Sequence, residues 1–131
     1  MNFINATLEK KDEDVYISFE GYSLKLPVEK ASDPAIQDYI GKEVVAGIRP
    51  ECIHDEPIYL STMSENVIEV SVDVTELMGA EIFLYLNSQE TNFIARVSPR
   101  SKAKVGDTIK VALDISRLHI FDKDTEKCIV H

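Results

Sequence analysis

The apolar and polar residues of this chain alternate with a period of two, which is typical of half-buried β-strands. The longest alternation covers residues 68–75, and it resumes in residues 81–86 after the turn Met78-Gly79-Ala80. A polar turn at residues 87–90 leads into a third alternating run at residues 92–97. Three such runs joined by short turns predict a meander of antiparallel strands.

Shorter alternating runs lie toward both ends of the chain. The strands predicted there cover residues 15–19, 22–26, 43–48, 109–113 and 118–121. Gly21 joins the first two in a hairpin, and polar turns at residues 104–107 and 122–125 flank the last two. Strands that recur about every ten residues predict an all-β sandwich or barrel.

One short helix is predicted between these strands. Asp33 is suited to cap it, Pro34 favours the first helical position, and Gly41 favours its end. Ile36 and Tyr39 give this helix an apolar face. Because so short a helix gains little from intrinsic propensity, we expect it to be held by packing that face onto the strands.

Length and composition are those of one globular domain. The chain has 131 residues, of which 44% are hydrophobic and 28% charged, and a chain of this size buries roughly two-thirds of its unfolded surface. Pro57 and the polar run at residues 61–66 mark at most an internal hinge, so we expect a single domain over residues 1–131. Cys52 and Cys128 lie far apart without ligand spacing, which predicts reduced thiols and no zinc site.

The charge of the chain limits its partners. The formal net charge of -9 produces a field that repels nucleic acid and anionic lipid, so neither is an expected partner. No run approaches the roughly 20 apolar residues that span a bilayer, and the first residues lack the plan of a signal peptide. We therefore expect a soluble chain without direct membrane insertion, whose partners are proteins or neutral molecules.

Catalytic motifs are missing from the sequence. Gly41-Lys42 is followed by Glu43, and Ile36 stands where a phosphate loop requires its first glycine. The histidines at positions 54, 119 and 131 occur singly, with no nucleophile or metal-ligand spacing around them. The sequence therefore predicts no catalytic, cofactor-binding or metal-binding residues, and no enzyme activity in this chain.

Several local phrases resemble one family. They are Met1-Asn2-Phe3-Ile4-Asn5-Ala6, Val45-Ala46-Gly47-Ile48-Arg49-Pro50-Glu51, Val74-Thr75-Glu76-Leu77-Met78-Gly79-Ala80-Glu81, Ala95-Arg96-Val97-Ser98-Pro99-Arg100-Ser101, Gly106-Asp107 and Leu118-His119-Ile120-Phe121-Asp122. In this order they are similar to the C-terminal, transport-associated OB (TOBE) domain of ATP-binding subunits of maltose and multiple-sugar ABC importers. Ser98 stands where the family commonly has an acidic or small residue, and Cys52 where it often has an acidic one, so the resemblance does not extend to these two positions.

The resemblance implies a fold and a role. The implied fold is an all-β, OB-like (MOP-like) β-barrel of short antiparallel strands with one short helix. The implied role is a regulatory and dimerisation domain that tethers two ATPase subunits and docks cytosolic regulators. The implied partners are an ATPase domain preceding Met1 in the parent protein, a second copy of the chain and the transporter's membrane subunits. ATP and Mg would belong to that ATPase domain, and the location would be cytoplasmic, peripheral at the inner face of the plasma membrane.

Three groups of residues are the interface candidates. Pro50 ends the strand at residues 43–48, which leaves Arg49 and Glu51 to pair either within the chain, as a strap, or across an interface. Gly79 is first of all a turn residue. The interface and regulatory candidates, taken together with the resemblance, are Arg49, Glu51, Gly79, Glu81, Arg100 and Lys102.

The segment at residues 96–104 carries four cations and no carboxylate. It is either a solvated loop or a dock for an acidic partner or an oxyanion, and related barrels bind oxyanions such as molybdate. Ser98, Ser101 and Lys102 are the residues of that alternative, a small-ligand sensor. Three aromatic residues, Phe83, Tyr85 and Phe93, suit either a stacking platform for single strands or packing under the helix, and the acidic charge favours packing.

Overall fold

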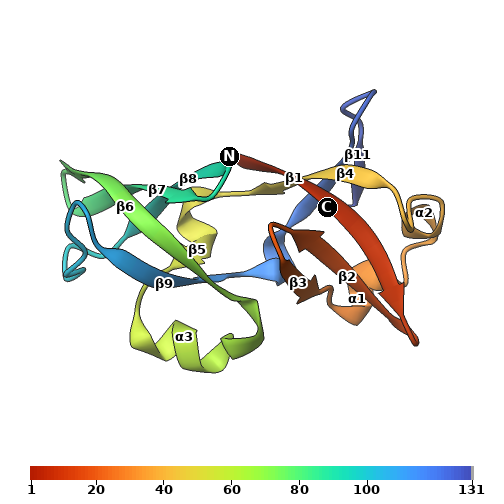
Figure 1. The fold of residues 1–131 in the computed structure, drawn as a ribbon, viewed down its shortest axis with the longest axis horizontal. Helices are drawn as coiled ribbons and strands as arrows, with labels where there is room; N and C mark the ends of the chain where they lie inside the picture. Colours follow the sequence, from red (N-terminus) through yellow and green to blue (C-terminus); the bar gives the residue numbers. More distant parts are fainter. Residues whose placement is uncertain (131) are drawn as a thin grey trace. The chain divides into compact units, whose positions relative to one another are not determined.

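The fold is described by a computed structural model that covers residues 1–130 (Figure 1). It consists mostly of antiparallel strands joined by short helical turns, so the predicted fold class is confirmed. His131 lies outside the described residues. Contacts divide the chain into two compact units: residues 3–48 and 115 onward with Met1 form the first, and residues 49–114 with Asn2 form the second. The single domain over residues 1–131 stays a prediction.

The first unit is built on a six-stranded sheet with the order β11-β10-β4-β1-β2-β3. Its strands are β1 (Asn2–Lys11), β2 (Asp14–Phe19), β3 (Tyr22–Lys25), β4 (Glu43–Ile48), β10 (His119–Asp122) and β11 (Cys128–Val130). The helical turns are α1 (Val28–Ala31), α2 (Pro34–Gln37) and the 3-10 turn η3 (Ile115–Arg117). The hairpin of β2 and β3 and the strand β4 match the predicted segments, whereas β1, β11 and α1 were not predicted.

The sheet of the first unit buries one face of each strand. In β1, Ile4, Ala6 and Leu8 are buried, and the residues between them are exposed or half-buried. Ile17 of β2 and Val44 of β4 add to the same core. Burial of these side chains contributes most of the stability of the sheet, at roughly 25 cal/mol for each Å² of apolar surface removed from water.

The predicted helix is present as α2. The Asp33 side chain accepts a hydrogen bond from the backbone N–H of Ala35 at 2.9 Å, Pro34 occupies the first turn, and Ile36 is fully buried. Gly41 has a positive φ of 81° and its N–H donates to the carbonyl of Leu8 at 2.6 Å. Asp33 therefore caps the helix and Pro34 begins it, as the sequence predicts. Gly41 ends the segment with a left-handed backbone, although the regular helix already ends at Gln37.

The second unit is a five-stranded sheet with the order β5-β9-β6-β7-β8. Its strands are β5 (Ile53–His54), β6 (Val67–Met78), β7 (Glu81–Ser88), β8 (Thr91–Val97) and β9 (Thr108–Leu113). Its helical turns are η1 (Pro50–Cys52), α3 (Pro57–Thr62) and η2 (Ser64–Asn66). The sheet curls until β8 contacts β5 and η1, which nearly closes a barrel. The meander of β6, β7 and β8 is confirmed, and α3 and η2 occupy the polar stretch that was interpreted as a hinge.

Strand β6 is longer than the barrel that it helps to form. Its first part, Val67 to Ser71, pairs with β9, and its second part pairs only with β7. The turn before β9 folds back onto Val72, whose N–H donates to Asp107 and whose carbonyl accepts from Gly106, both at 2.8 Å. Beyond Val72 the pairing register with β7 shifts, and every residue from Asp73 to Met78 is exposed. Residues 73–81 therefore form an exposed edge of the sheet together with the turn into β7, because β7 itself pairs with β8 from Ile82 onward; this segment is called the arm below.

No helix among residues 1–130 is long and apolar enough to cross a membrane.

The turn of the arm offers a test of local backbone strain. Gly79 has φ +63°, and a Cβ added there would meet no atom within 4 Å. We expect Gly79→Ala to lower the free energy of unfolding by about 1–2 kcal/mol, because only the left-handed backbone is penalised. Gly79→Asn should cost less, since asparagine tolerates this conformation. Urea unfolding measures both, and equal losses for the two variants would contradict the explanation.

Candidate functional site

Arg96 of β8 brings two of the candidate residues together. Its Nε lies 2.8 Å from Oε2 of Glu81, at the start of β7, and its Nη2 lies 3.8 Å from Oε2 of Glu51, in η1. Glu51 reaches this position because Pro50 ends the β4 strand and starts the 3-10 turn. Glu51 therefore forms a strap within the chain, which is one of the two alternatives that the sequence left open.

The other residues of the two motifs lie apart from this cluster. Arg49 is exposed, and its carbonyl accepts the N–H of Cys52 at 2.9 Å. Gly79 has a conformational role in the turn, as predicted. Gly47 has a packing role instead, because a Cβ there would lie 2.7 Å from Sδ of Met1 and 2.8 Å from Cε2 of Phe121.

A cleft of about 720 Å³ lies beside the basic segment. Its apolar lining includes Pro57 and Leu60 of α3 and Ile109 of β9, and its cationic lining includes Arg100, Lys102 and Lys110. We call it the basic cleft. Two interface candidates, Arg100 and Lys102, thus border one cavity with an apolar wall.

Carboxylates also border the basic cleft, and they change its chemistry. The Ser101 hydroxyl donates to Oδ2 of Asp55 at 2.5 Å, and the Ser98 hydroxyl accepts the N–H of Arg100 at 3.2 Å. An oxyanion at these serines would therefore approach a negative charge. The structure brings Ser98, Ser101 and Lys102 to one cavity, but together with an acidic neighbour that the sequence did not indicate.

The cations of the basic cleft are available to an outside partner. Among residues 1–130, no ion pair involves Arg100, Lys102 or Lys110. Asp107 is held by the backbone N–H of Lys104 at 2.9 Å, and Asp55 by Ser101. Asp55 and Asp107 are thus engaged within the chain, whereas the three cations are not, and the exposed Glu56 also borders the cleft.

The three aromatic residues do not lie on one face of the sheet. Phe93 is 2% exposed and pairs with Leu86 on the buried face. Phe83 and Tyr85 are half-buried on the opposite face, where they pair with Arg96 and Ile94. A stacking platform needs rings on a common surface, so that alternative is wrong. The expectation that all three rings pack under the helix is wrong as well, because Phe83 and Tyr85 lie on the face opposite to Phe93.

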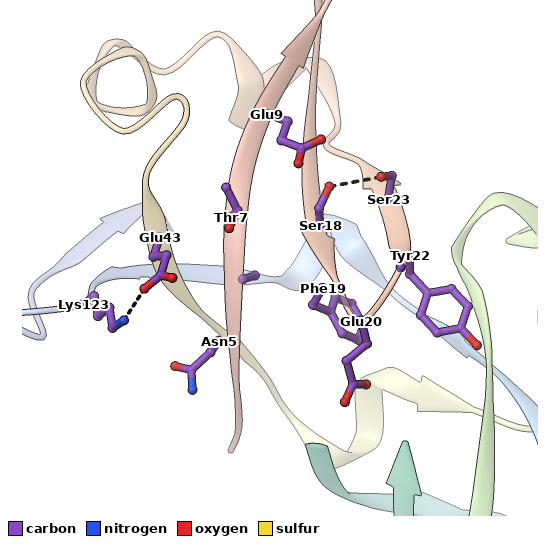
Figure 2. A pocket seen from close by; sticks show the side chains of 12 residues that line it. Asn5, Thr7, Glu9, Ser18, Phe19, Glu20, Tyr22, Ser23, Glu43 and Lys123 are labelled. Carbon is purple, nitrogen blue, oxygen red and sulfur yellow. Dashed lines mark hydrogen bonds and ion pairs between the residues drawn. The ribbon is translucent and has the colours of Figure 1, made fainter. Parts of the chain in front are cut away.

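The first unit has a polar hollow of about 570 Å³ over β1, β2 and β4 (Figure 2). Asn5, Thr7 and Glu9 reach it from β1, together with Ser18 of β2. The hydroxyls of Ser18 and Ser23 are 3.0 Å apart. These side chains are suited to hydrogen bonding, and the aromatic residues Phe19 and Tyr22 also line the hollow. The described residues contain no cluster of three or more acidic, histidine or cysteine side chains placed to hold a metal ion.

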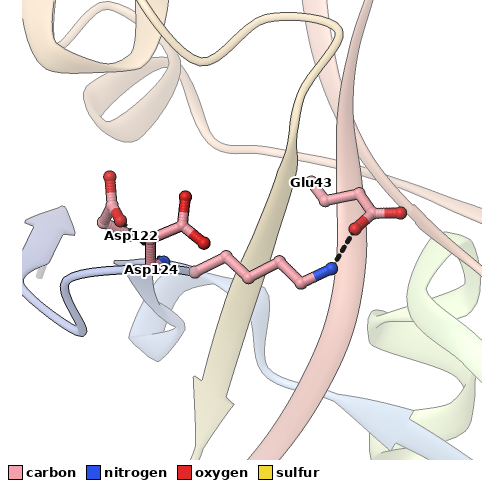
Figure 3. Close-up of polar contacts among 4 residues, drawn as sticks. Glu43, Asp122 and Asp124 are labelled. Carbon is pink, nitrogen blue, oxygen red and sulfur yellow. Dashed lines mark hydrogen bonds and ion pairs between the residues drawn. The ribbon is translucent and has the colours of Figure 1, made fainter.

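A second polar group ties the last turn of the first unit to its sheet. Lys123 forms an ion pair with Glu43, which raises the pKa of Lys123 and lowers that of Glu43 (Figure 3). Asp122 accepts the Tyr39 hydroxyl at 2.6 Å and the N–H groups of Thr125 and Asp124 at 2.8 Å. The Tyr39 hydrogen bond, followed by that from Thr125, lowers the pKa of Asp122 to about 2. The turn at residues 122–125 could be predicted, but its pairings with Tyr39 and Glu43 could not, because these partners lie 83 and 80 positions away along the chain.

The curled antiparallel sheet, closed by η1 and strapped through Arg96, defines a small OB-like barrel domain. The sequence profile of the TOBE domain matches residues 46–121, and that of the MalK OB fold domain matches residues 1–53. The chain belongs to the TOBE domain family, and it corresponds to the OB and TOBE region of sugar-importer ATP-binding subunits.

Several curated proteins are similar to the chain. It is 38% identical to the oligosaccharides import ATP-binding protein MsmX of Bacillus subtilis over 96% of its length, and 31% identical to the trehalose/maltose import ATP-binding protein MalK of Thermococcus litoralis over 98%. It spans only 33% and 34% of those proteins. Among solved structures, the cytoplasmic molybdate-binding protein ModG matches with a TM-score of 0.67 and 18% identity, covering 91% of this chain and 94% of that one. This likeness concerns the fold.

Asp122→Asn tests the polar group of Figure 3 through pH. Because the pKa of Asp122 is lowered from 3.8 to about 2 in the folded state, its carboxylate stabilises the fold above about pH 4, and this stabilisation is lost as the pH falls through about 2. We expect the variant to unfold at lower urea than the unmodified chain at neutral pH. The difference should shrink between about pH 4 and 2. Tyr39→Phe should reproduce part of it, and a difference independent of pH would contradict the assignment.

A double-mutant cycle tests the Arg96 strap. All three side chains are more than a third exposed, so we expect Arg96→Met to lower the free energy of unfolding by under about 1 kcal/mol. The coupling of Arg96 to Glu81, measured with Glu81→Gln, should exceed its coupling to Glu51, measured with Glu51→Gln, because the first pair is closer. Both couplings should fall at high salt. A larger coupling to Glu51 would contradict the geometry.

Proposed function

We propose that this chain is the regulatory C-terminal domain of the ATP-binding subunit of a sugar ABC importer. The observation that carries the proposal is the match to two family profiles that together run from residue 1 to residue 121. The similarity to MsmX and MalK, each about three times as long as the matched region, supports it. In this proposal ATP and Mg bind to an ATPase domain, which this region of the subunit does not contain.

We further propose that the domain holds two subunits together and docks regulators. A self-associating domain keeps two ATPase domains at a high effective concentration, so that they meet again without diffusing through bulk solution. The proposed partners are therefore the ATPase domain of the same subunit, a second copy, the membrane subunits and a cytosolic regulatory protein. The proposed location is the cytoplasmic face of the plasma membrane, through the transporter complex.

An oxyanion or small-ligand sensor is the second candidate. The observation that favours it is the basic cleft, which Ser98, Ser101 and Lys102 border beside cations that form no ion pair among residues 1–130. The carboxylate of Asp55 argues against a small anion at the serines, because Ser101 donates its proton there. Calorimetric titration with molybdate, tungstate, phosphate and sugars tests this candidate, and the absence of heat across that panel would eliminate it.

Self-association of the chain tests the main proposal. We expect sedimentation velocity to show weak, reversible association that increases with protein concentration. We also expect no ATP hydrolysis above background, because the sequence has no phosphate loop. A chain that stays monomeric at the highest soluble concentration would contradict the tethering role. Turnover of ATP by the purified chain would contradict the assignment to a regulatory domain.

A further inference from the structure

Strand β1 presents a row of four outward side chains with different chemistry. Phe3, Asn5, Thr7 and Glu9 alternate with buried residues, so they lie on the outer face of the six-stranded sheet. Outward neighbours on one strand are about 7 Å apart, which gives the row a length of about 20 Å. The row therefore offers an aromatic ring, an amide, a hydroxyl and a carboxylate along one line.

The polar side chains of this row have no partner in the part of the chain that the structure describes. Those of Asn5, Thr7 and Glu9 take part in no hydrogen bond or ion pair among residues 1–130. All three border the polar hollow, where the hydroxyls of Ser18 and Ser23 meet beside them (Figure 2). Two hydroxyls together have two donors and four lone pairs, so their mutual contact leaves most of this capacity to a ligand.

The aromatic end of the row is open to solvent. Phe3 is 60% exposed, and its ring meets that of Phe121 in β10 edge to face, with the centroids 6.0 Å apart. Phe121 lies two residues before Lys123, which borders the hollow. The face of an aromatic ring carries partial negative charge and attracts C–H groups. An apolar surface thus lies next to the hydrogen-bonding groups.

The charges around the polar hollow exclude one class of ligand. Glu9, Glu20 and Glu43 border it, and Lys123, the one cation among its described lining residues, is already paired with Glu43. In a chain with a net charge of -9, this surface repels anions. A wholly apolar ligand would in turn cover the amide and hydroxyl groups without bonding them, which costs free energy for each group. The ligand that fits is therefore neutral and combines hydroxyl groups with an apolar face.

We propose that the outer face of β1 binds a neutral carbohydrate of at least two sugar rings. The faces of a pyranose carry C–H groups, its hydroxyls both donate and accept, and the row is longer than one ring. One ring packs on Phe3, hydroxyls of the two rings bond Asn5 and Thr7, and Glu9 accepts from two neighbouring hydroxyls. The hollow of about 570 Å³ lies within the roughly 300–1,000 Å³ of small-molecule sites. The inference goes beyond the proposed tethering role and does not depend on it.

Titrations observed by NMR test the class of ligand. We expect maltose to shift backbone signals of β1 and of Phe121, with a dissociation constant on the order of a millimolar, because an open sheet face encloses only part of a ligand. Glucose, which has one ring, should bind at least about threefold more weakly than maltose. Sorbitol, which has hydroxyls but no ring face, should bind at least about tenfold more weakly. Inorganic phosphate should leave these signals unchanged.

Variants of the row test the site itself. We expect Phe3→Ala to weaken maltose binding at least about tenfold, and Phe3→Tyr to stay within about twofold because it keeps the ring. Thr7→Val should weaken binding about threefold, since one hydrogen bond is lost. Leu77→Ala and Thr75→Val make similar changes at exposed positions of β6, and both should leave maltose binding unchanged. Circular dichroism and thermal unfolding should show normal folding, since exposed positions contribute little to stability.

The outcomes decide between this ligand and the other candidates. Maltose shifts that persist unchanged in Phe3→Ala and Thr7→Val, or that fall in the basic cleft instead of β1, would overturn the site. Sorbitol binding as tight as that of maltose would overturn the role of the ring face, and with it the carbohydrate. Silence of the β1 signals up to about 50 mM maltose would overturn the whole inference. Sedimentation velocity tests the tethering role separately, so the two proposals can fail independently.

Discussion

The unequal lengths of β6 and β9 are the constraint on which the second unit depends. β9 supplies hydrogen bonds to β6 only as far as Ser71, and the turn before β9 closes the ladder at Val72. Up to that point β6 pairs with β9 and buries one face in the barrel, and its pairing with β7 begins at Ser71. Beyond it, only β7 remains, and the same strand continues as an exposed arm. One strand thus builds both part of the core and an exposed edge of the sheet.

The strands with regular alternation could be predicted from the sequence because a half-buried sheet imposes that pattern locally. β1 was not predicted, although Ile4, Ala6 and Leu8 alternate with exposed or half-buried residues. At the start of the strand the polar Asn2 is buried and the apolar Phe3 is exposed, which is the reverse of the usual pattern. The Asn2 side chain is buried because it replaces a strand neighbour, bonding both the N–H and the carbonyl of Ile94. Because Asn2 and Ile94 are 92 positions apart, this pairing leaves no pattern in the neighbouring sequence. Turns as short as α1 and α3 likewise form through packing rather than propensity.

The candidate site was predicted in its parts but not in its connections. The sequence indicated Glu51, Glu81 and a basic segment, yet the ion pairs through Arg96 depend on how η1, β7 and β8 meet in the barrel. The hydrogen bond from Ser101 to Asp55 joins residues 46 positions apart, and it engages one of the two serines that the anion-binding alternative would use. The basic character of residues 96–104 could therefore be predicted from the sequence. Which of its charged side chains form ion pairs depends on the fold.

The turn phrase from Glu76 to Glu81 contains two kinds of residue. Gly79 and Glu81 have roles within the chain, because one supplies the left-handed backbone and the other pairs with Arg96. Glu76 and Leu77 have no comparable role, since both side chains are exposed and their removal would leave the barrel intact. The side chain of Leu77 is 71% exposed, so burial does not explain a leucine at this position. Local backbone geometry and one ion pair thus account for Gly79 and Glu81, whereas they place no demand on the two side chains between the ladder and the turn.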